Sequence, residues 1–345
     1  MKLLIATDAW APQVNGVVKT LGSLVGELKR RGVDICVVSP DDFPTMPLPT
    51  YHEIKLAWPW PSVIREKLAA FRPHHIHIAT EGPIGWAIRH ACLHDGRVFT
   101  TSYHTRFPEY LLARAPIPLD VSYAALRSFH NAGHGVMVST QSIENELAAR
   151  GFTNLMRWGR GVDLKRFRPD ARTEGLPHWP RPVFLTVGRL APEKNLDAFL
   201  GLDLPGTKVV IGDGPSAAEL RDRHRQVVFL GPRDHDELPS LYAHADVFVF
   251  PSLTDTFGLV LIEAMACGLP VAAFDVAGPR DVVGGSAAGV LGPDLRSNAL
   301  AALRINREAC RSHALGFTWE KSADQFLANV EAAQNAKRRE LESAA

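Results

Sequence analysis

Two charged segments in the second half of the chain each follow a short apolar run, and their residue types suit the binding of an anion. The segment GRLAPEKN at 188–195 places Arg189 and Lys194 five residues apart. It follows an apolar run and precedes an expected helix. Both cations can reach a diphosphate there, because free backbone N–H groups at a helix N-terminus add to the positive field. A solvated charged loop is the alternative interpretation.

The second segment carries two carboxylates. Asp255 and Glu263 are eight residues apart, and Gly258 between them lets backbone N–H groups approach an anion. Carboxylate oxygens accept hydrogen bonds from the hydroxyls of a sugar or a ribose. Asp255 can instead cap the helix that is expected from about Phe257. Glu263 can instead be a surface charge, but its apolar neighbours mean that it needs a partner.

Polar residues also follow apolar runs in the first half of the chain. His104 comes just after an expected strand, where its ring can donate or accept a hydrogen bond, and a structural role is the alternative. Asp8, Asn15 and Gly16 lie in the loop after the first apolar run. The glycine permits close approach of a phosphate or a sugar.

Two clusters raise the question of a bound metal ion. His74, His75 and His77 run along one expected strand, whose residues alternate between faces, so a shared ion is disfavoured. Residues 234–236 read DHD, as in some metal-dependent nucleotide-sugar enzymes, but Asp236 is better explained as the cap of a helix beginning at residue 237. No metal site is therefore expected. The chain also has no GxGxxG, GxxxxGK, HExxH or GxSxG motif, which removes the usual signatures of several enzyme classes.

The elements that position these residues alternate between short apolar runs and helical patterns, as in doubly wound α/β domains. In such parallel sheets, ligands bind at the carboxyl ends of the strands. The expected strands are 2–7, 33–39, 75–79, 98–101, 135–139, 183–187, 208–211, 227–230, 247–250 and 271–274.

A stretch rich in Arg, Pro and Gly interrupts this alternation. We therefore expect a first Rossmann-like domain at 1–160 and a linker at 161–182. A second Rossmann-like domain is expected at 183–316. An amphipathic helix is expected in the tail at 317–345.

The composition sets limits on the class of protein. The chain has 345 residues, 46% of them hydrophobic and 22% charged, with a net charge of +1. These values indicate about two packed domains and exclude disorder, collagen and coiled coil. The balanced charge argues against a nucleic-acid partner, while the net +4 of residues 1–160 fits an anionic surface or chance composition. Without a CxxC pair or a long apolar run, we expect a cytoplasmic protein with free thiols, at most peripheral to a membrane.

These motifs, in this order, resemble the retaining glycosyltransferases of family 4. That family has the GT-B fold, in which two Rossmann-like domains face each other across a cleft and a C-terminal helix crosses back to the first domain. The resemblance implies that the first domain binds the acceptor and the second binds the nucleotide sugar. Two segments, GRLAPEKN and the span from Asp255 to Glu263, resemble its phosphate-binding segment and its acidic pair, although the first acidic residue is usually Glu. The segments ATEGP at 79–83 and SYHTRFPEY at 102–110 resemble the subgroup of sulfoquinovosyl-lipid synthases and mannosyltransferases. The segments RGVD at 160–163 and FTWE at 317–320 resemble the family linker and its C-terminal crossover.

The resemblance implies that a hexose is transferred from a nucleotide-diphosphate sugar, linked to UDP or GDP, with retention at the anomeric carbon. It assigns the neutralisation of the leaving diphosphate to Arg189 and Lys194, so that neither a metal nor a cofactor is needed. It assigns the ribose to Glu263 and the donor sugar to Asp255 and His104 as the catalytic pair. The other substrate-binding residues that it implies are Gly16, Phe257, Gly258, Leu259 and Val260, with Asn15, Glu81 and Arg106 on the acceptor side.

The acceptor is expected to be a membrane lipid such as diacylglycerol. Residues 58–68 combine Trp, aliphatic and basic side chains, as segments at a membrane interface do, although an ordinary packed loop and helix explains them equally well. A mannosyltransferase acting on a glycan or polysaccharide precursor is the alternative within the class. The alternatives outside the glycosyltransferase class are a non-catalytic nucleotide-sugar-binding module and a GT-B epimerase or phosphorylase.

Overall fold

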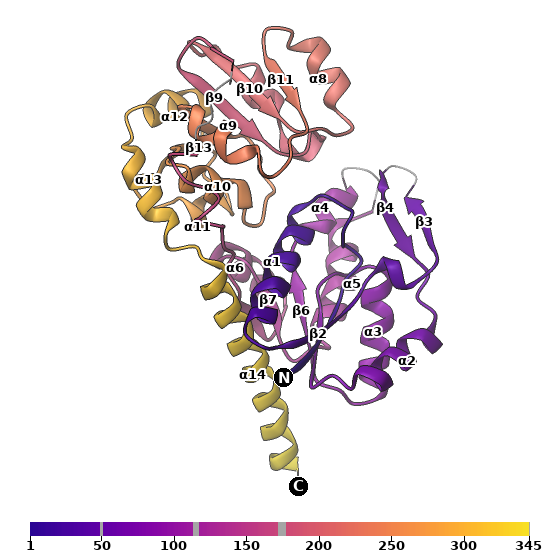
Figure 1. Cartoon of the computed structure of the whole chain (residues 1–345). Helices are drawn as coiled ribbons and strands as arrows, with labels where there is room; N and C mark the ends of the chain where they lie inside the picture. The colour runs from indigo at the N-terminus through magenta and orange to yellow at the C-terminus, as the bar shows by residue number, and fades with distance from the viewer. Residues whose placement is uncertain (49–50, 113–116, 172–176, 345) are drawn as a thin grey trace. The chain divides into compact units, whose positions relative to one another are not determined.

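The chain folds as two compact units (Figure 1). The first unit comprises residues 1–159 and 319–345, and the second comprises residues 160–318. The computed structural model describes residues 1–48, 51–112, 117–171 and 177–344. The second unit contains the segment 161–182, part of which, at 172–176, lies outside the described residues.

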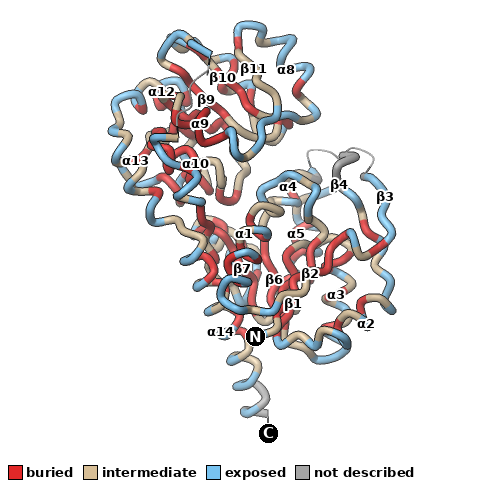
Figure 2. The backbone as a smooth tube through the Cα atoms, in the orientation of Figure 1, coloured by how far each residue is buried: buried red, intermediate tan, exposed pale blue. Residues whose placement is uncertain are grey.

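The first unit is built on a six-stranded parallel sheet with the order β2-β1-β5-β6-β7-β8. Successive residues of β1 point to opposite faces, so Leu4 and Ala6 enter one core while Leu3 and Ile5 enter the other. Figure 2 shows the central strands of this sheet in the buried interior of the unit. The strands are β1 (Lys2–Ala6), β2 (Asp34–Val38), β5 (His75–Ile78), β6 (Phe99–Tyr103), β7 (Val136–Val138) and β8 (Leu155–Arg157).

Helices cover this sheet, and a separate antiparallel pair of strands, which the sequence did not predict, lies between β2 and β5 along the chain. That pair is β3 (Thr45–Leu48) and β4 (Tyr51–Ala57). The helices are α1 (Gly16–Arg30), α2 (Pro61–Phe71), α3 (Pro83–His94), α4 (Phe107–Leu112), α5 (Leu119–His130) and α6 (Gln141–Ala149).

The last helix of the chain, α14 (Trp319–Ala344), packs on the first unit and completes its core. The Phe326 ring lies against the rings of His77 and Trp158, with centroids 5.0 and 5.2 Å away. The indole N–H of Trp158 donates to Ser322 Oγ at 3.0 Å. The expectation that the C-terminal helix returns to the first domain is therefore confirmed.

The second unit holds another six-stranded parallel sheet, with the order β11-β10-β9-β12-β13-β14. The expected pair of Rossmann-like α/β domains is thus confirmed, although the sequence did not predict the edge strands β8 and β14. The strands are β9 (Val183–Val187), β10 (Thr207–Ile211), β11 (Val228–Gly231), β12 (Val247–Phe250), β13 (Val271–Ala273) and β14 (Gly289–Leu291). The helices are α7 (Asp197–Leu200), α8 (Ala217–Arg223), α9 (Leu238–His244), α10 (Leu259–Ala266), α11 (Pro279–Val282), α12 (Leu295–Ala302) and α13 (Arg307–Ala314).

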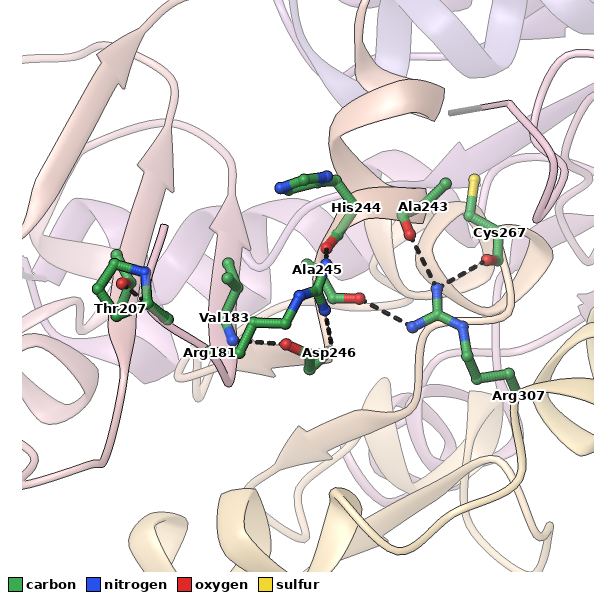
Figure 3. A network of polar contacts seen from close by, with 10 residues as sticks. Arg181, Val183, Thr207, Ala243, His244, Ala245, Asp246, Cys267 and Arg307 are labelled. Atoms are coloured by element: carbon green, nitrogen blue, oxygen red, sulfur yellow. Dashed lines mark hydrogen bonds and ion pairs between the residues drawn. The ribbon is translucent and has the colours of Figure 1, made fainter. Parts of the chain in front are cut away.

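One arginine joins the ends of two helices in the second unit. Figure 3 shows the Arg307 guanidinium directed at backbone carbonyl groups where α9 and α10 end. It donates to the carbonyl oxygens of Ala245 at 2.8 Å, Ala243 at 3.1 Å and Cys267 at 3.5 Å. These carbonyls have no partner within their own helices, and a cation at a helix C-terminus also interacts favourably with the helix dipole. Arg307 therefore fixes α10, whose other end lies among the candidate site residues.

Replacing Arg307 should destabilise the second unit. We expect Arg307→Ala to lower the free energy of unfolding by about 2 kcal/mol, because charge-assisted hydrogen bonds to half-buried carbonyls are lost. Urea unfolding followed by circular dichroism measures this change. Arg304→Ala is the matched control, because Arg304 lies nearby in the chain and is exposed. Equal midpoints for the two variants would show that the helix ends do not depend on Arg307.

Candidate functional site

The main cluster of expected site residues lies where the strand order of the second unit reverses. β9 and β12 are neighbours in the sheet, and their connections lead toward opposite edges. At such a switch point the loops diverge and leave a crevice beyond the carboxyl ends of the strands. Arg189 and Lys194 follow β9, while Asp255 and Gly258 follow β12. The topology of the sheet therefore brings together two segments that are about sixty residues apart in the sequence.

Polar side-chain contacts join these two loops. The Lys194 ammonium donates to Asp255 Oδ1 at 2.6 Å. Asn195 Nδ2 donates to the carbonyl of Pro251 at 3.1 Å, and Thr254 Oγ1 donates to the carbonyl of Glu193 at 3.3 Å. The loops after β9 and β12 consequently form one surface, which carries Arg189 as a second cation.

Asp255 does not cap a helix, so that alternative is wrong. The N-cap of α10 is Gly258, which adopts a positive φ of 84°. The Asp255 side chain is 18% exposed and pairs with Lys194. A carboxylate beside an ammonium can exchange this partner for a ligand hydroxyl while the cation turns to a phosphate.

The N-terminus of α10 contributes backbone N–H groups to the same edge. Leu259 and Val260 form its first turn and are half-buried. The first N–H groups of a helix have no partner within it, so they can donate to an anion. The Phe257 ring is buried and lies 6.1 Å from the Phe317 ring, centroid to centroid, so this side chain belongs to the core.

Glycines let further loops approach this edge. A Cβ at Gly212 would lie 1.9 Å from the carbonyl oxygen of Gly188, and one at Gly214 would lie 2.5 Å from that of Leu190. A Cβ at Gly278 would lie 2.6 Å from the Asp255 carbonyl oxygen. Sequence reasoning missed these contacts, although GDG directly after an expected strand was an available signal.

Glu263 is buried on α10 and has the partner that its apolar neighbours required. Its side chain is 3% exposed, and the Tyr242 hydroxyl donates to Oε2 at 3.2 Å. His235 Nε2 lies 3.7 Å from Oε1. Glu263 is therefore not a surface charge. The sequence did not predict either partner, because both lie on other elements of the fold.

The DHD segment does not cap a helix. α9 begins at Leu238, and its N-cap is Glu237, so the expectation that Asp236 caps this helix is wrong. Asp236 instead pairs with Arg166 at 2.6 Å, because a guanidinium from a distant part of the chain reaches it. Within the described ranges, no three His, Cys, Asp or Glu side chains are grouped so that they could hold a metal ion.

In the first unit the strand order reverses between β1 and β5, and Asp8 and Glu81 follow these two strands. Asp8 accepts hydrogen bonds from Thr80 Oγ1 at 2.8 Å and from the Ile84 N–H at 2.9 Å. Burial raises the pKa of Asp8. Glu81 Oε1 lies 3.0 Å from Nε2 of the fully buried His130. Both carboxylates are thus held in place at the carboxyl edge of this sheet.

The remaining residues expected in the first unit have separate local roles. Asn15 Oδ1 accepts from two backbone N–H groups at 3.0 Å and caps α1, of which Gly16 is the first residue. The His104 ring lies edge-on to Trp158, with centroids 5.7 Å apart. Arg106 pairs with Glu146 at 2.6 Å. Asn15 and Gly16 follow β1, whereas His104 and Arg106 follow β6.

His75 and His77 are structural residues of the first unit. His75 and His77 both lie within 3.0 Å of the Thr100 hydroxyl in the core of the first unit. Burial lowers the pKa of His75 to about 3, so this ring stays neutral. The four cysteines are free thiols, and burial raises the pKa of Cys267 to about 12.

The segment at 58–68 presents indoles to solvent. Trp58 is 63% exposed and Trp60 is 52% exposed, directly before α2. A search of the described residues finds no helix of the length and apolar character that crossing a membrane requires.

Comparison with known proteins connects this geometry to one family. The model "Glycosyltransferase Family 4" matches residues 14–166, and "Glycosyl transferases group 1" matches residues 181–306. The chain is 31% identical to a GDP-mannose-dependent alpha-mannosyltransferase of Mycobacterium tuberculosis, over 96% of this chain and 97% of that protein. It is 30% identical to the sulfoquinovosyl transferase SQD2 of Arabidopsis thaliana, over 78% of this chain and 58% of that protein.

Solved structures share the fold. Sucrose-phosphate synthase from Thermosynechococcus elongatus matches with a TM-score of 0.78 at 22% identity, over 100% of both chains. Anabaena HepE in complex with UDP matches with a TM-score of 0.69 at 16% identity, over 96% of this chain and 100% of that one. Both sheets, the strand-end motifs and the near full-length similarity agree, and the chain belongs to the family 4 glycosyltransferases.

Proposed function

We propose that this glycosyltransferase moves a hexose from a nucleotide-diphosphate sugar to an acceptor hydroxyl with retention at the anomeric carbon. The contact that carries the proposal is the 2.6 Å pair of Lys194 with Asp255 beside the N-terminus of α10. It places a cation suited to phosphate next to a carboxylate suited to sugar hydroxyls. The bond that breaks in the donor joins these two kinds of group.

Charge stabilisation comes from fixed groups in this proposal. Arg189, Lys194 and the N–H groups of the first turn of α10 receive the negative charge that develops on the leaving diphosphate. Glu263 holds the ribose hydroxyls, and His104 contacts the donor sugar. Because the two side-chain cations supply the positive charge, transfer should proceed without a divalent metal and without a cofactor.

The donor is GDP-mannose or another GDP- or UDP-linked hexose. Support for a GDP-linked donor comes from relatives in Mycobacterium tuberculosis and Mycolicibacterium smegmatis, both named GDP-mannose-dependent alpha-mannosyltransferases, of which the chain covers 97%. A sulfoquinovosyl transferase among the relatives supports a lipid acceptor such as diacylglycerol. The acceptor binds the first unit near Asn15, Gly16, Glu81 and Arg106, and the exposed indoles before α2 contact an anionic membrane surface at the cytoplasmic face. A glycan acceptor for mannose is the second candidate, favoured by the same mannosyltransferase relatives.

The donor nucleotide can be identified by thermal unfolding. We expect GDP or UDP, but not both equally, to stabilise the chain by about 2.7 kcal/mol at a hundredfold excess over its Kd. The same shift should persist in EDTA. ADP serves as the control nucleotide. A shift that requires a divalent metal would refute the assignment of charge stabilisation to Arg189 and Lys194.

The two cations should be essential for transfer. Removing either one, as in Arg189→Ala or Lys194→Ala, should lower kcat about 100- to 1000-fold, since each stabilises charge that develops in the transition state. Initial rates with radiolabelled nucleotide sugar measure this loss, and circular dichroism checks the fold. Arg225→Ala is the control, because its side chain is 82% exposed and pairs only with nearby Asp222 in the described contacts. Near-normal turnover of the double variant at Arg189 and Lys194 would contradict the proposed function.

A further inference from the structure

The DHD segment after β11 belongs to a series of side-chain contacts that ends at Glu263. Arg166 Nη2 lies 2.6 Å from Asp236 Oδ1, and Arg166 Nη1 lies 2.5 Å from His235 Nδ1. His235 Nε2 in turn lies 3.7 Å from Glu263 Oε1. All four residues belong to the second unit.

The contact with Arg166 determines which nitrogen of His235 carries the proton. A guanidinium has only N–H donors, so Nδ1 of His235 must accept, and the proton of the neutral ring is on Nε2. This Nε2 is shielded from solvent and is directed at Glu263. The His235 ring also packs edge-on to Phe167, with centroids 5.1 Å apart, which fixes the plane of the ring. The N–H of His235 therefore points toward one oxygen of the Glu263 carboxylate.

The two oxygens of Glu263 are thus held differently. Oε2 accepts from the buried Tyr242 hydroxyl at 3.2 Å, whereas Oε1 faces the N–H of His235 at a separation too long for a full hydrogen bond. Rotation of the carboxylate would lose the first contact and misplace the second. The Glu263 carboxylate therefore has a defined orientation.

We propose that Arg166 and His235 are positioning residues, which orient Glu263 for the ribose of the nucleotide sugar and so set the affinity for the donor. The inference rests on the proposed role of Glu263 in donor binding. Arg166 and His235 are 40% and 35% exposed, whereas Glu263 is 3% exposed. Both positioning residues can therefore be replaced without opening the core.

The test compares His235→Leu with His235→Gln. Loss of the N–H should raise both the KM for the nucleotide sugar and the Kd for GDP or UDP severalfold, because the carboxylate loses the group that faces Oε1. The kcat should change less than about twofold, because the contact serves binding equally in the ground and transition states. Gln should recover most of the affinity, since its side-chain amide can place an N–H near the position of Nε2.

His224 provides a matched control in the same unit. It lies 2.9 Å from Asp197, so His224→Leu also removes an imidazole beside a carboxylate, but one remote in sequence from Glu263. We expect its KM and Kd to equal those of the unmodified protein. Thermal unfolding of every variant separates loss of binding from loss of stability.

Double variants show whether the effect passes through Glu263. Arg166→Leu should weaken binding as His235→Leu does, and the pair should be no worse than either alone, because residues in one series of contacts are not additive. In a Glu263→Gln background, His235→Leu should have no further effect. Full additivity, or a lower melting temperature with unchanged KM and Kd, would overturn the proposal.

A failure of the proposed function would give a different pattern of binding from a failure of the positioning role. If Glu263→Gln leaves GDP and UDP binding unchanged, the ribose assignment is wrong and the positioning role is overturned with it. If Glu263→Gln weakens binding but His235→Leu does not, only the positioning role is overturned.

Discussion

The reversal of strand order between β9 and β12 is the constraint on which the second unit depends. Parallel strands on either side of the reversal send their connections to opposite edges, so neither loop can cover the end of the other strand. The loops at this exposed edge must be held in place by contacts that leave space for a ligand. The pair of Lys194 and Asp255 does this, because it links the two loops through side chains that a ligand can separate. The same contact therefore stabilises the two loops and holds together the cation and the carboxylate that we propose for donor binding.

The two units compensate for the burial of a carboxylate with different kinds of hydrogen-bond partner. In the second, Glu263 is surrounded by apolar residues, and the cost of its burial is offset by the Tyr242 hydroxyl and the facing imidazole of His235. In the first, Asp8 offsets its burial by accepting hydrogen bonds from Thr80 and from the start of α3, and its pKa remains raised. Asp8 is held by its own loop and the start of α3, whereas Glu263 is held by side chains from other elements of the second unit.

Contacts of the supporting helices also stabilise the candidate site residues. Arg307 binds the carboxyl ends of α9 and α10 (Figure 3), so it supports α10 at the end opposite to its N-terminus. α14 has a comparable role in the first unit, where Phe326 closes the core beside Trp158. The ring of His104 packs on that same Trp158, so the last helix of the chain supports a residue that precedes it by more than two hundred positions.

The sequence by itself determined the type of fold and the loops that carry the chemistry. Apolar runs such as 183–187 and 247–250 became strands with those bounds, because burial on both faces of a parallel sheet demands uninterrupted apolar residues. The edge strands β8 and β14 escaped prediction because they are three residues long and only half-buried. Such strands lack the long apolar run on which the prediction depended.

Only the tertiary structure decided which partner each charged side chain has. Local sequence suggested helix caps for Asp255 and Asp236, whereas the fold pairs them with Lys194 and Arg166 from distant segments. The fold also places the Tyr242 hydroxyl against Glu263. The apolar neighbours of this carboxylate indicate that it needs a hydrogen-bond donor, but they do not identify the residue that supplies it. Local patterning reports the burial of a residue, but the energy of a buried charge depends on groups a few ångströms away, and the topology of the sheet determines which groups those are.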